Sequence, residues 1–371
     1  MNRREFAGLA GGAVLAAALA PHAASAAESP DARARALYRR VLVLDCNSSP
    51  PFNGDQPLAP ADLEMVRSSG IDVLKLSLGG INSNFADTVA EIGQVAMLIE
   101  RHPETFMAVR TAADLRRTQQ ERRLGIILSF ESADMLGGRL DSFTVFRDLG
   151  VLVMQLSYNR RSPFAAGVME PDGGGLTVLG RDAVREMNRL GIAIDVSHAN
   201  AATTSDVLAL SQRPVVMTHA GCAAVHAHPR NKSDEQLRAL AAKGGVVGIY
   251  DLPYLTASPR QPQLADYMQH LAHALEVAGS EHVGIGSDVG IEPFDTSPKG
   301  MAEFQQQEAV RTASGLAAPE EDRPTYVEGL NTPHRLEIIA GELLRRGYSE
   351  TVTEGVLGGN FARVFTEIWS A

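Results

Sequence analysis

The sequence lacks several features that would place it in a specialised class of protein. Only 2 cysteines occur in 371 residues, which excludes a disulfide-dense scaffold and a zinc module built on four cysteines. The 34 basic residues are outnumbered by 44 acidic ones, so the basic face of a nucleic-acid-binding protein is missing. No apolar run reaches the ~20 residues of a stable membrane span. The composition that remains is that of an ordinary globular protein.

The first 26 residues have the pattern of an export signal. Residues 3–6 read Arg-Arg-Glu-Phe, the twin-arginine pattern, and a weakly apolar run over residues 7–20 follows. The small residues Ala-Ser-Ala at 24–26 supply a cleavage site. We therefore expect residues 1–26 to be a twin-arginine signal and the mature protein to be periplasmic or secreted. That pathway carries folded proteins, which suits a protein that takes up a metal before export.

Residues 27–371 repeat one unit, a short apolar run followed by a helical pattern, and no linker divides them. Eight alternations predict an α/β fold, a single TIM-type (β/α)8 barrel domain with C-terminal helices. The segment 289–324 is rich in Gly, Pro and charge, which predicts a long loop near the barrel mouth, and residues 331–347 predict an amphipathic helix. The predicted strands are Val41–Cys46, Ile71–Leu78, Gly125–Glu131, Val151–Tyr158, Ala193–His198, Pro214–His219, Val246–Tyr250 and His282–Asp288.

Several of these runs end in a polar or ionisable residue. The residues are Glu131, Tyr158, His198, His219 and Asp288. The carboxyl ends of barrel strands meet at one mouth, where the active sites of such barrels lie. Ionisable groups are costly to bury there unless they pair or bind a metal. Two imidazoles with one or two carboxylates are the ligands of a hydrolytic zinc site, so the sequence predicts one.

Longer stretches resemble the membrane (renal) dipeptidase family, zinc metallopeptidases of the amidohydrolase-like barrel superfamily. They are Leu176–Gly191, Ile194–His198, Met217–His219, His228–Asn231, Gly284–Asp288 and Gly358–Arg363. The resemblance implies a two-zinc site in which His198 and His219 hold one ion and Glu131 bridges both. It implies that Asp288 serves the other ion and moves the proton. It also implies that Arg230 grips the substrate or its developing oxyanion.

The chain departs from the family at the end of the first strand, where the family has a His-x-Asp motif. Here Asn47 and Ser49 take those two positions, and neither is a good zinc ligand. We therefore expect one zinc ion on Glu131, His198 and His219. The second position is left empty, weakly filled, or rebuilt from Cys46, Asp45 or Asp55. Strand alternation turns Cys46 toward the helices if position 47 faces the mouth.

Two further positions keep alternatives open. Tyr158 stands where some family members have a histidine; its hydroxyl can donate to the tetrahedral oxygen, or its ring can pack against substrate. Asn159, the next residue, can orient a ligand group or cap a helix. Cys46 and Cys222 can form a disulfide after export or stay free thiols.

The predicted function is that of an exported zinc-dependent hydrolase that cleaves a dipeptide or similar small amide with metal-activated water. Asp288, Tyr158 and Arg230 are the predicted catalytic residues, and Glu131, His198, His219 and Asp288 the predicted metal residues. Two alternatives stay open. One is another substrate of the same barrel, such as an N-acyl amino acid, a lactone or a siderophore intermediate. The other is a non-hydrolytic exported binding or maturation protein. The resemblance also leaves a homodimer open.

Overall fold

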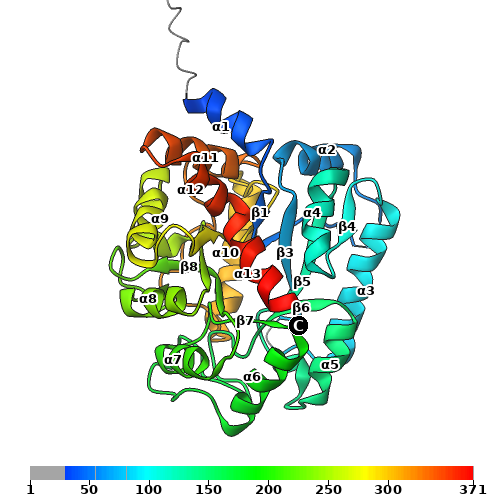
Figure 1. Ribbon diagram of the computed structural model, residues 1–371, viewed down its shortest axis with the longest axis vertical. Coiled ribbons are helices and arrows are strands. Elements are labelled where there is room, and N and C mark those ends of the chain that lie inside the picture. Colours follow the sequence, from blue (N-terminus) through cyan, green and yellow to red (C-terminus); the bar gives the residue numbers. More distant parts are fainter. Residues whose placement is uncertain (1–29, 55, 81, 371) are drawn as a thin grey trace, which may run out of the picture.

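Eight parallel strands follow one another around a nearly closed barrel, as the sequence predicts, in the order β1-β3-β5-β6-β7-β8-β10-β11 (Figure 1). The computed structural model describes residues 30–54, 56–80 and 82–370, so the predicted export signal lies outside the described residues. The barrel strands are β1 (Leu44–Asp45), β3 (Val73–Leu78), β5 (Leu124–Phe130), β6 (Val151–Gln155), β7 (Ala193–Asp195), β8 (Val216–Cys222), β10 (Val246–Ile249) and β11 (Val283–Ile285).

Short strands extend the barrel at several points. β4 (Phe106–Ala108) pairs with β5, and β9 (Asn231–Lys232) pairs with β8. The first and last barrel strands meet through the backbone, where the Cys46 amide donates to the Ile285 carbonyl at 2.9 Å. Just beyond them β2 (Ser48–Ser49) pairs with β12 (Val289–Gly290), so the chain on either side of Asn47 is fixed against the chain on either side of Asp288.

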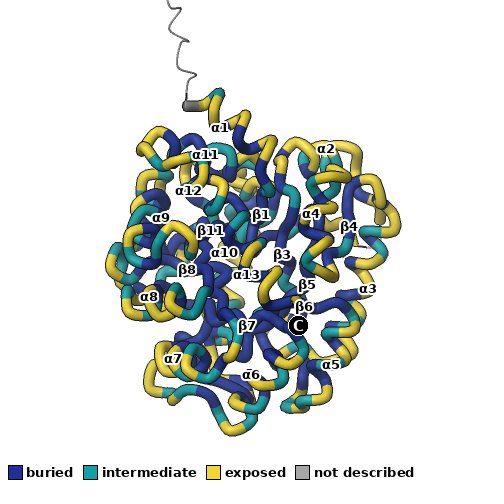
Figure 2. Tube along the Cα trace, viewed as in Figure 1, coloured by how far each residue is buried: buried dark blue, intermediate teal, exposed yellow. Residues whose placement is uncertain are grey.

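Helices surround the strands, and the buried residues of Figure 2 concentrate on the strands and on the inner sides of these helices. Several begin at a capping residue: Thr111 precedes α4, and the Ser233 hydroxyl accepts from the backbone amide of Gln236 at the start of α8. The helices are α1 (Pro30–Tyr38), α2 (Pro60–Ser69), α3 (Phe85–Arg101), α4 (Ala112–Glu121), α5 (Asp141–Asp148), α6 (Val178–Leu190), α7 (Ala201–Leu210), α8 (Asp234–Ala242), α9 (Leu264–Ala278), α10 (Pro298–Ala313), α11 (Arg335–Arg345), α12 (Glu350–Glu354) and α13 (Asn360–Trp369). Single helical turns occupy Asp134–Leu136, Pro253–Leu255 and Gly355–Gly359.

The C-terminal helix α13 closes the end of the barrel where the strands begin. Phe361 and Phe365 pack in one buried cluster with Val73 and Val216, the first residues of β3 and β8. The Asn360 amide donates to the carbonyl of Val283, which begins β11. This end of the barrel is therefore filled by apolar side chains. The polar side chains lie at the opposite end, where the strands finish.

The segment after the eighth barrel strand differs from the sequence prediction. Within 289–324, predicted as a loop, the structure contains the sixteen-residue helix α10. Ser297 caps it by accepting from the Gly300 amide at 3.3 Å, and Pro298 occupies its first turn. Apart from Gly300 its residues are half-buried or exposed, so the apolar periodicity that reveals a core-facing helix is absent. Across the described residues, no helix combines the length and apolarity that a membrane crossing requires.

Candidate metal centre

Three side chains from or just after β5, β7 and β8 converge on one point at the carboxyl end of the barrel. Glu131 directly follows β5, His198 lies three residues after β7, and His219 lies within β8. One ligand atom from each lies within 4.8 Å of the others. Both imidazoles are buried, whereas the Glu131 side chain keeps 19% of its surface exposed. The strand ends that the sequence singles out therefore meet, and one edge of the cluster is open to the mouth.

The hydrogen bond behind His198 fixes which of its ring nitrogens carries the proton. Nδ1 lies 2.8 Å from Oδ1 of Asn159. The orientation of this amide is set by its other end, since Nδ2 of Asn159 donates to the Leu316 carbonyl at 3.0 Å. An amide oxygen can only accept, so Nδ1 of His198 is the donor and Nε2 keeps a free lone pair.

A hydroxyl plays the same part behind His219. Nδ1 lies 2.9 Å from Oγ1 of Thr218, and that hydroxyl donates its own proton to Oδ2 of Asp195 at 2.6 Å. The threonine oxygen therefore accepts from His219, whose Nε2 is also left unprotonated. This is the arrangement of a metal-ligating histidine, whose other nitrogen donates to a group that orients the ring.

The two unprotonated nitrogens face each other across the centre. Nε2 of His198 lies 3.1 Å from Nε2 of His219. Burial, together with the positive charge of Arg230, lowers the pKa of both imidazoles well below the usual value, so both are neutral at pH 7. Two neutral nitrogens with lone pairs turned toward each other repel, unless a cation binds both. The donor set therefore fits a metal ion, held by the two Nε2 atoms and Oε2 of Glu131, which lies 3.8 Å from His198 Nε2.

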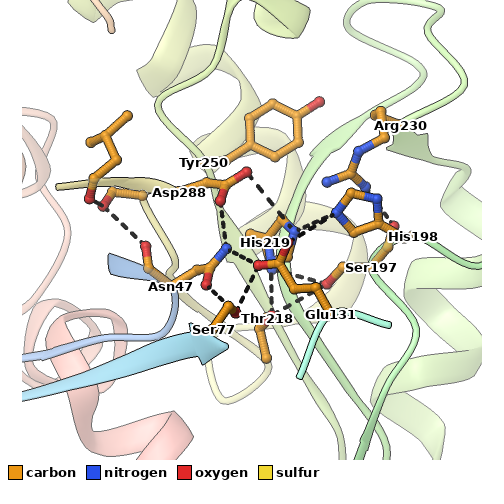
Figure 3. A network of polar contacts seen from close by, with 12 residues as sticks. Asn47, Ser77, Glu131, Ser197, His198, Thr218, His219, Arg230, Tyr250 and Asp288 are labelled. Atoms are coloured by element: carbon orange, nitrogen blue, oxygen red, sulfur yellow. Dashed lines mark hydrogen bonds and ion pairs between the residues drawn. The ribbon is translucent and has the colours of Figure 1, made fainter. Parts of the chain in front are cut away.

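Asp288 and Asn47 lie beside this triad. Nδ2 of Asn47 donates to Oε1 of Glu131 at 2.8 Å and to Oδ1 of Asp288 at 2.5 Å. Oδ2 of Asp288 lies 3.9 Å from Nε2 of His219, and the aspartate backbone is held in the left-handed region at φ 59°. Burial and the charge of Glu131 raise the pKa of Asp288 well above its usual value. Figure 3 shows these side chains converging on the centre: Asn47, Glu131, His198, His219 and Asp288.

Arg230 and Tyr158 border the cluster. Nη1 of Arg230 donates to the Ser197 carbonyl at 2.7 Å, whereas the buried Nη2 has no hydrogen-bond partner within the described chain. The Tyr158 ring stacks on the His198 ring, with 4.0 Å between the ring centroids. Burial raises the pKa of Tyr158 to about 12, so its hydroxyl stays protonated and can donate.

A cavity of about 380 Å³ opens beside Glu131 and Tyr158. Its wall includes Arg311, which α10 supplies and which forms an ion pair with Glu321. Its other wall residues are Ser77, Leu78, Gly79, Gly80, Glu91 and Ser132. The volume suits a small ligand. The helix that the sequence pattern does not reveal thus contributes a cation to this cavity.

The structure also shows where the alternative ligands of a second metal lie. Asp45 is fully buried and accepts from the amide and hydroxyl of Ser287, away from the triad. Cys46 is fully buried in an apolar cluster that also contains Leu44, Val73 and Phe361 of α13. Asp55 lies outside the described residues. Cys46 and Cys222 are both free and buried.

Sequence reasoning missed three polar residues that shape the centre. Asp195 and Thr218 orient His219. Asp195 lies three residues before His198 and Thr218 directly precedes His219, so their places near the candidate ligands were the available signal. Lys75 is fully buried in the middle of β3, 3.9 Å from Oε1 of Glu131. A lysine inside an otherwise apolar strand was the signal there, because a buried ammonium needs an acidic or polar partner.

Comparison with known proteins places the chain near metallopeptidases and dipeptidases. A model of the membrane dipeptidase family, peptidase family M19, matches residues 31–311. Dipeptidase verJ of Clonostachys rogersoniana is 30% identical over 285 residues, which are 76% of this chain and 65% of that protein. Dipeptidase tcpJ of Claviceps purpurea is 27% identical over 290 residues, 77% of this chain and 61% of that protein. The chain thus matches less than two thirds of the length of these curated relatives.

The fold is shared with a solved structure. The crystal structure of an amidohydrolase from Pseudomonas aeruginosa superimposes with a TM-score of 0.80 at 28% sequence identity. The similarity covers 93% of this chain and 100% of that one.

Proposed function

Because the chain belongs to the membrane dipeptidase family, peptidase family M19, a family of metallohydrolases, we propose that it hydrolyses a dipeptide or a similar small amide with the help of zinc. The observation that carries this proposal is the pair of unprotonated Nε2 atoms, 3.1 Å apart, beside Glu131. The names of the dipeptidase relatives support the amide as the bond that is cleaved.

The proposed metal content is one zinc ion per chain. His198 and His219 supply two imidazole nitrogens and Glu131 one carboxylate oxygen, a donor set that suits zinc and leaves a position for water or substrate. A zinc ion bound there would act as a Lewis acid and make water nucleophilic near neutral pH. Asn47 offers an N–H donor where a second ion would need an acceptor, which supports a count of one.

Asp288 is the proposed proton carrier. The Asn47 amide holds Oδ1, so Oδ2 is the oxygen turned toward the triad. In the proposed reaction Oδ2 accepts the proton of the attacking water and returns it to the nitrogen of the leaving amine. Both transfers need the same oxygen close to the triad, which the hydrogen bond from Asn47 secures.

Arg230 and Tyr158 are the proposed donors to substrate oxygens. Nη2 of Arg230 is buried without a partner among the described residues, so a carboxylate or an oxyanion would satisfy it. The protonated Tyr158 hydroxyl can donate to the oxygen on which negative charge develops. A donor to the developing oxyanion stabilises the transition state more than the ground state and so accelerates the reaction, whereas a contact to a substrate carboxylate holds the substrate in place.

Export through the twin-arginine pathway, with removal of residues 1–26, is part of the proposal. It is supported by the Arg-Arg-Glu-Phe pattern at residues 3–6 and the small residues at 24–26. The proposed location is the periplasm or the exterior of the cell.

Metal analysis and a substrate panel test the proposed function together. Purified protein should contain close to one zinc per chain, and L,L- and L,D-dipeptides should release free amino acids only when zinc is present. His219→Ala should lose both zinc and activity, whereas the exposed Val178→Ala, on α6, should keep both. Bound zinc with no hydrolysis across the panel would reject the dipeptidase activity. Protein that takes up no zinc at any concentration would reject the metal centre itself.

A further inference from the structure

Lys75 is a buried cation below the metal centre that the proposed chemistry does not use. Its side chain has no exposed surface. Nζ donates to the hydroxyls of Ser77 at 2.9 Å and Ser129 at 3.1 Å, and it lies 3.9 Å from Oε1 of Glu131. A lysine is almost never fully buried unless it is paired, and Glu131 is the carboxylate that pairs with it.

The same network occupies one of the two oxygens of Glu131. Oε1 accepts from Nδ2 of Asn47 at 2.8 Å, and the Ser77 hydroxyl lies 2.8 Å away from it. The Lys75 ammonium, 3.9 Å away, adds a positive charge to these two neutral donors. Oε1 is therefore committed to protein donors, and only Oε2 faces the histidines. A carboxylate that bridges two metal ions would need both oxygens free.

Asn47 ties this network to Asp288. Its Nδ2 lies between the carboxylates of Glu131 and Asp288, 2.8 Å from one and 2.5 Å from the other. The orientation of the amide follows from these two contacts, since carboxylate oxygens accept hydrogen bonds and only the amide nitrogen can donate to both. Two carboxylates that would otherwise repel each other are thus joined by the Asn47 amide (Figure 3). The buried Lys75 ammonium lies 3.9 Å from one of them, Glu131.

We propose that the Lys75 ammonium and the Asn47 amide take the place of a second metal ion, and that the ammonium prevents a second ion from binding. This inference rests on the proposed zinc site and concerns its ion count and charge balance. Lys75 supplies a fixed positive charge, and Asn47 supplies the donors that link Glu131 to Asp288. Both are positioning residues, because they hold the two carboxylates and do not reach the substrate cavity.

The charge of Lys75 and the side chain at position 47 make separable contributions to excluding a second ion. With Asn47 replaced by aspartate, three carboxylates would meet where the amide now lies, a good ligand set for a divalent cation. Lys75 would still neutralise part of that charge and repel a second ion. Removal of both groups would leave three carboxylates without a built-in cation. The second ion should therefore bind only when both residues are changed.

The test counts zinc ions in Asn47→Asp, alone and combined with Lys75→Met. Metal-free protein is dialysed against buffered Zn²⁺, and bound zinc is measured by mass spectrometry per mole of chain. Wild type and Asn47→Asp should bind one ion, and Asn47→Asp/Lys75→Met should bind two. Asn47→Asp/Ser129→Ala is the matched control: it removes a hydrogen-bond partner of Lys75 but keeps the ammonium, so it should bind one.

Thermal unfolding shows that each variant is folded, and Asn47→Asp/Lys75→Gln replaces the methionine variant if that one does not fold. Two ions in Asn47→Asp alone would show that Lys75 does not exclude the second ion. One ion in Asn47→Asp/Lys75→Met or Asn47→Asp/Lys75→Gln would show that the Lys75 charge is not what excludes the second ion. Two ions in wild type would overturn the inference and leave the hydrolase proposal intact, whereas no ion in wild type would overturn the hydrolase proposal as well.

Discussion

Thr218→Val should weaken zinc binding without changing any of the proposed zinc ligands. The Thr218 hydroxyl accepts from Nδ1 of His219 at 2.9 Å and donates to Oδ2 of Asp195 at 2.6 Å. Valine has nearly the same shape but neither function. His219 would then keep its Nδ1 proton without an acceptor, or move the proton to Nε2, where it would block the lone pair that faces the metal.

The loss of zinc affinity in Thr218→Val can be estimated from the cost of leaving the Nδ1 proton of His219 without an acceptor. A buried donor left without a partner costs about 1 to 3 kcal/mol. Because each ~1.4 kcal/mol is tenfold in a binding constant, zinc affinity should fall about 5- to 150-fold. Loss of such an orienting group typically lowers metal affinity about 10- to 100-fold, within the same range. Asp195 keeps its other partners, including Nε2 of Gln155 at 2.9 Å, so the fold should survive.

Competition against a chelator of known affinity measures the zinc dissociation constant, and Thr218→Ser is the matched control. Serine keeps the hydroxyl and loses only a methyl group, so its zinc affinity should stay within about threefold of wild type, less than ~0.7 kcal/mol. An unchanged affinity in the valine variant would refute the assignment of the His219 tautomer. An equal loss in the serine variant would attribute the effect to packing.

Three further outcomes are expected. Tyr158→Phe should lower kcat about 10- to 100-fold and leave the zinc count at one, because it removes one donor to the developing oxyanion; an unchanged kcat would assign the ring to packing alone. Asp288→Asn should lower kcat about 10²- to 10⁴-fold with zinc still bound, measured with the same dipeptide, and a smaller loss would place the proton acceptor elsewhere. Asp72→Asn tests a buried acid far from the centre, since burial raises the pKa of Asp72 to about 6 from 3.8. An acid whose pKa is higher in the folded than in the unfolded state contributes stability that is fully present below the unfolded pKa and is lost as the pH rises through the folded pKa. Wild type therefore loses this contribution between about pH 4 and 6. The variant should match wild type near pH 4 and exceed it by about 1 to 3 kcal/mol at pH 7.5 in urea unfolding, and a constant difference would contradict the shift.

The barrel could be predicted because its strands carry their own signal. Parallel strands covered by helices are apolar on both faces, so each appears in the sequence as a short apolar run between turns. The convergence of the candidate ligands could be predicted because the carboxyl ends of barrel strands meet at one mouth, which brings Glu131 and His219 together whatever the loops do. Helix α10 has no buried face and depends on its cap at Ser297, so periodicity could not reveal it.

The charge balance around the ligands could not be predicted in the same way. The run that forms β3 contains Lys75, but the sequence does not say which strand its ammonium meets. That depends on the stagger of β3 against β5, where Lys75 pairs with Ile127 and Ser77 with Ser129. Only this register places the ammonium just below Oε1 of Glu131. Asn47 is similar: the sequence shows that it is a poor ligand, but its role as a donor between two carboxylates requires three strands to be positioned together.

Asp195 shows why the ligands and the fold cannot vary independently. Its buried carboxylate accepts from the amide and hydroxyl of Ser197 at 2.9 and 2.6 Å, and from the amide and hydroxyl of Thr218 at 3.1 and 2.6 Å. Ser197 and Thr218 immediately precede the proposed zinc ligands His198 and His219. One carboxylate thus fixes the ends of β7 and β8 against each other and, through them, the separation of the two Nε2 atoms. A change that loosens this carboxylate should lower stability and zinc affinity together, because the same hydrogen bonds determine both.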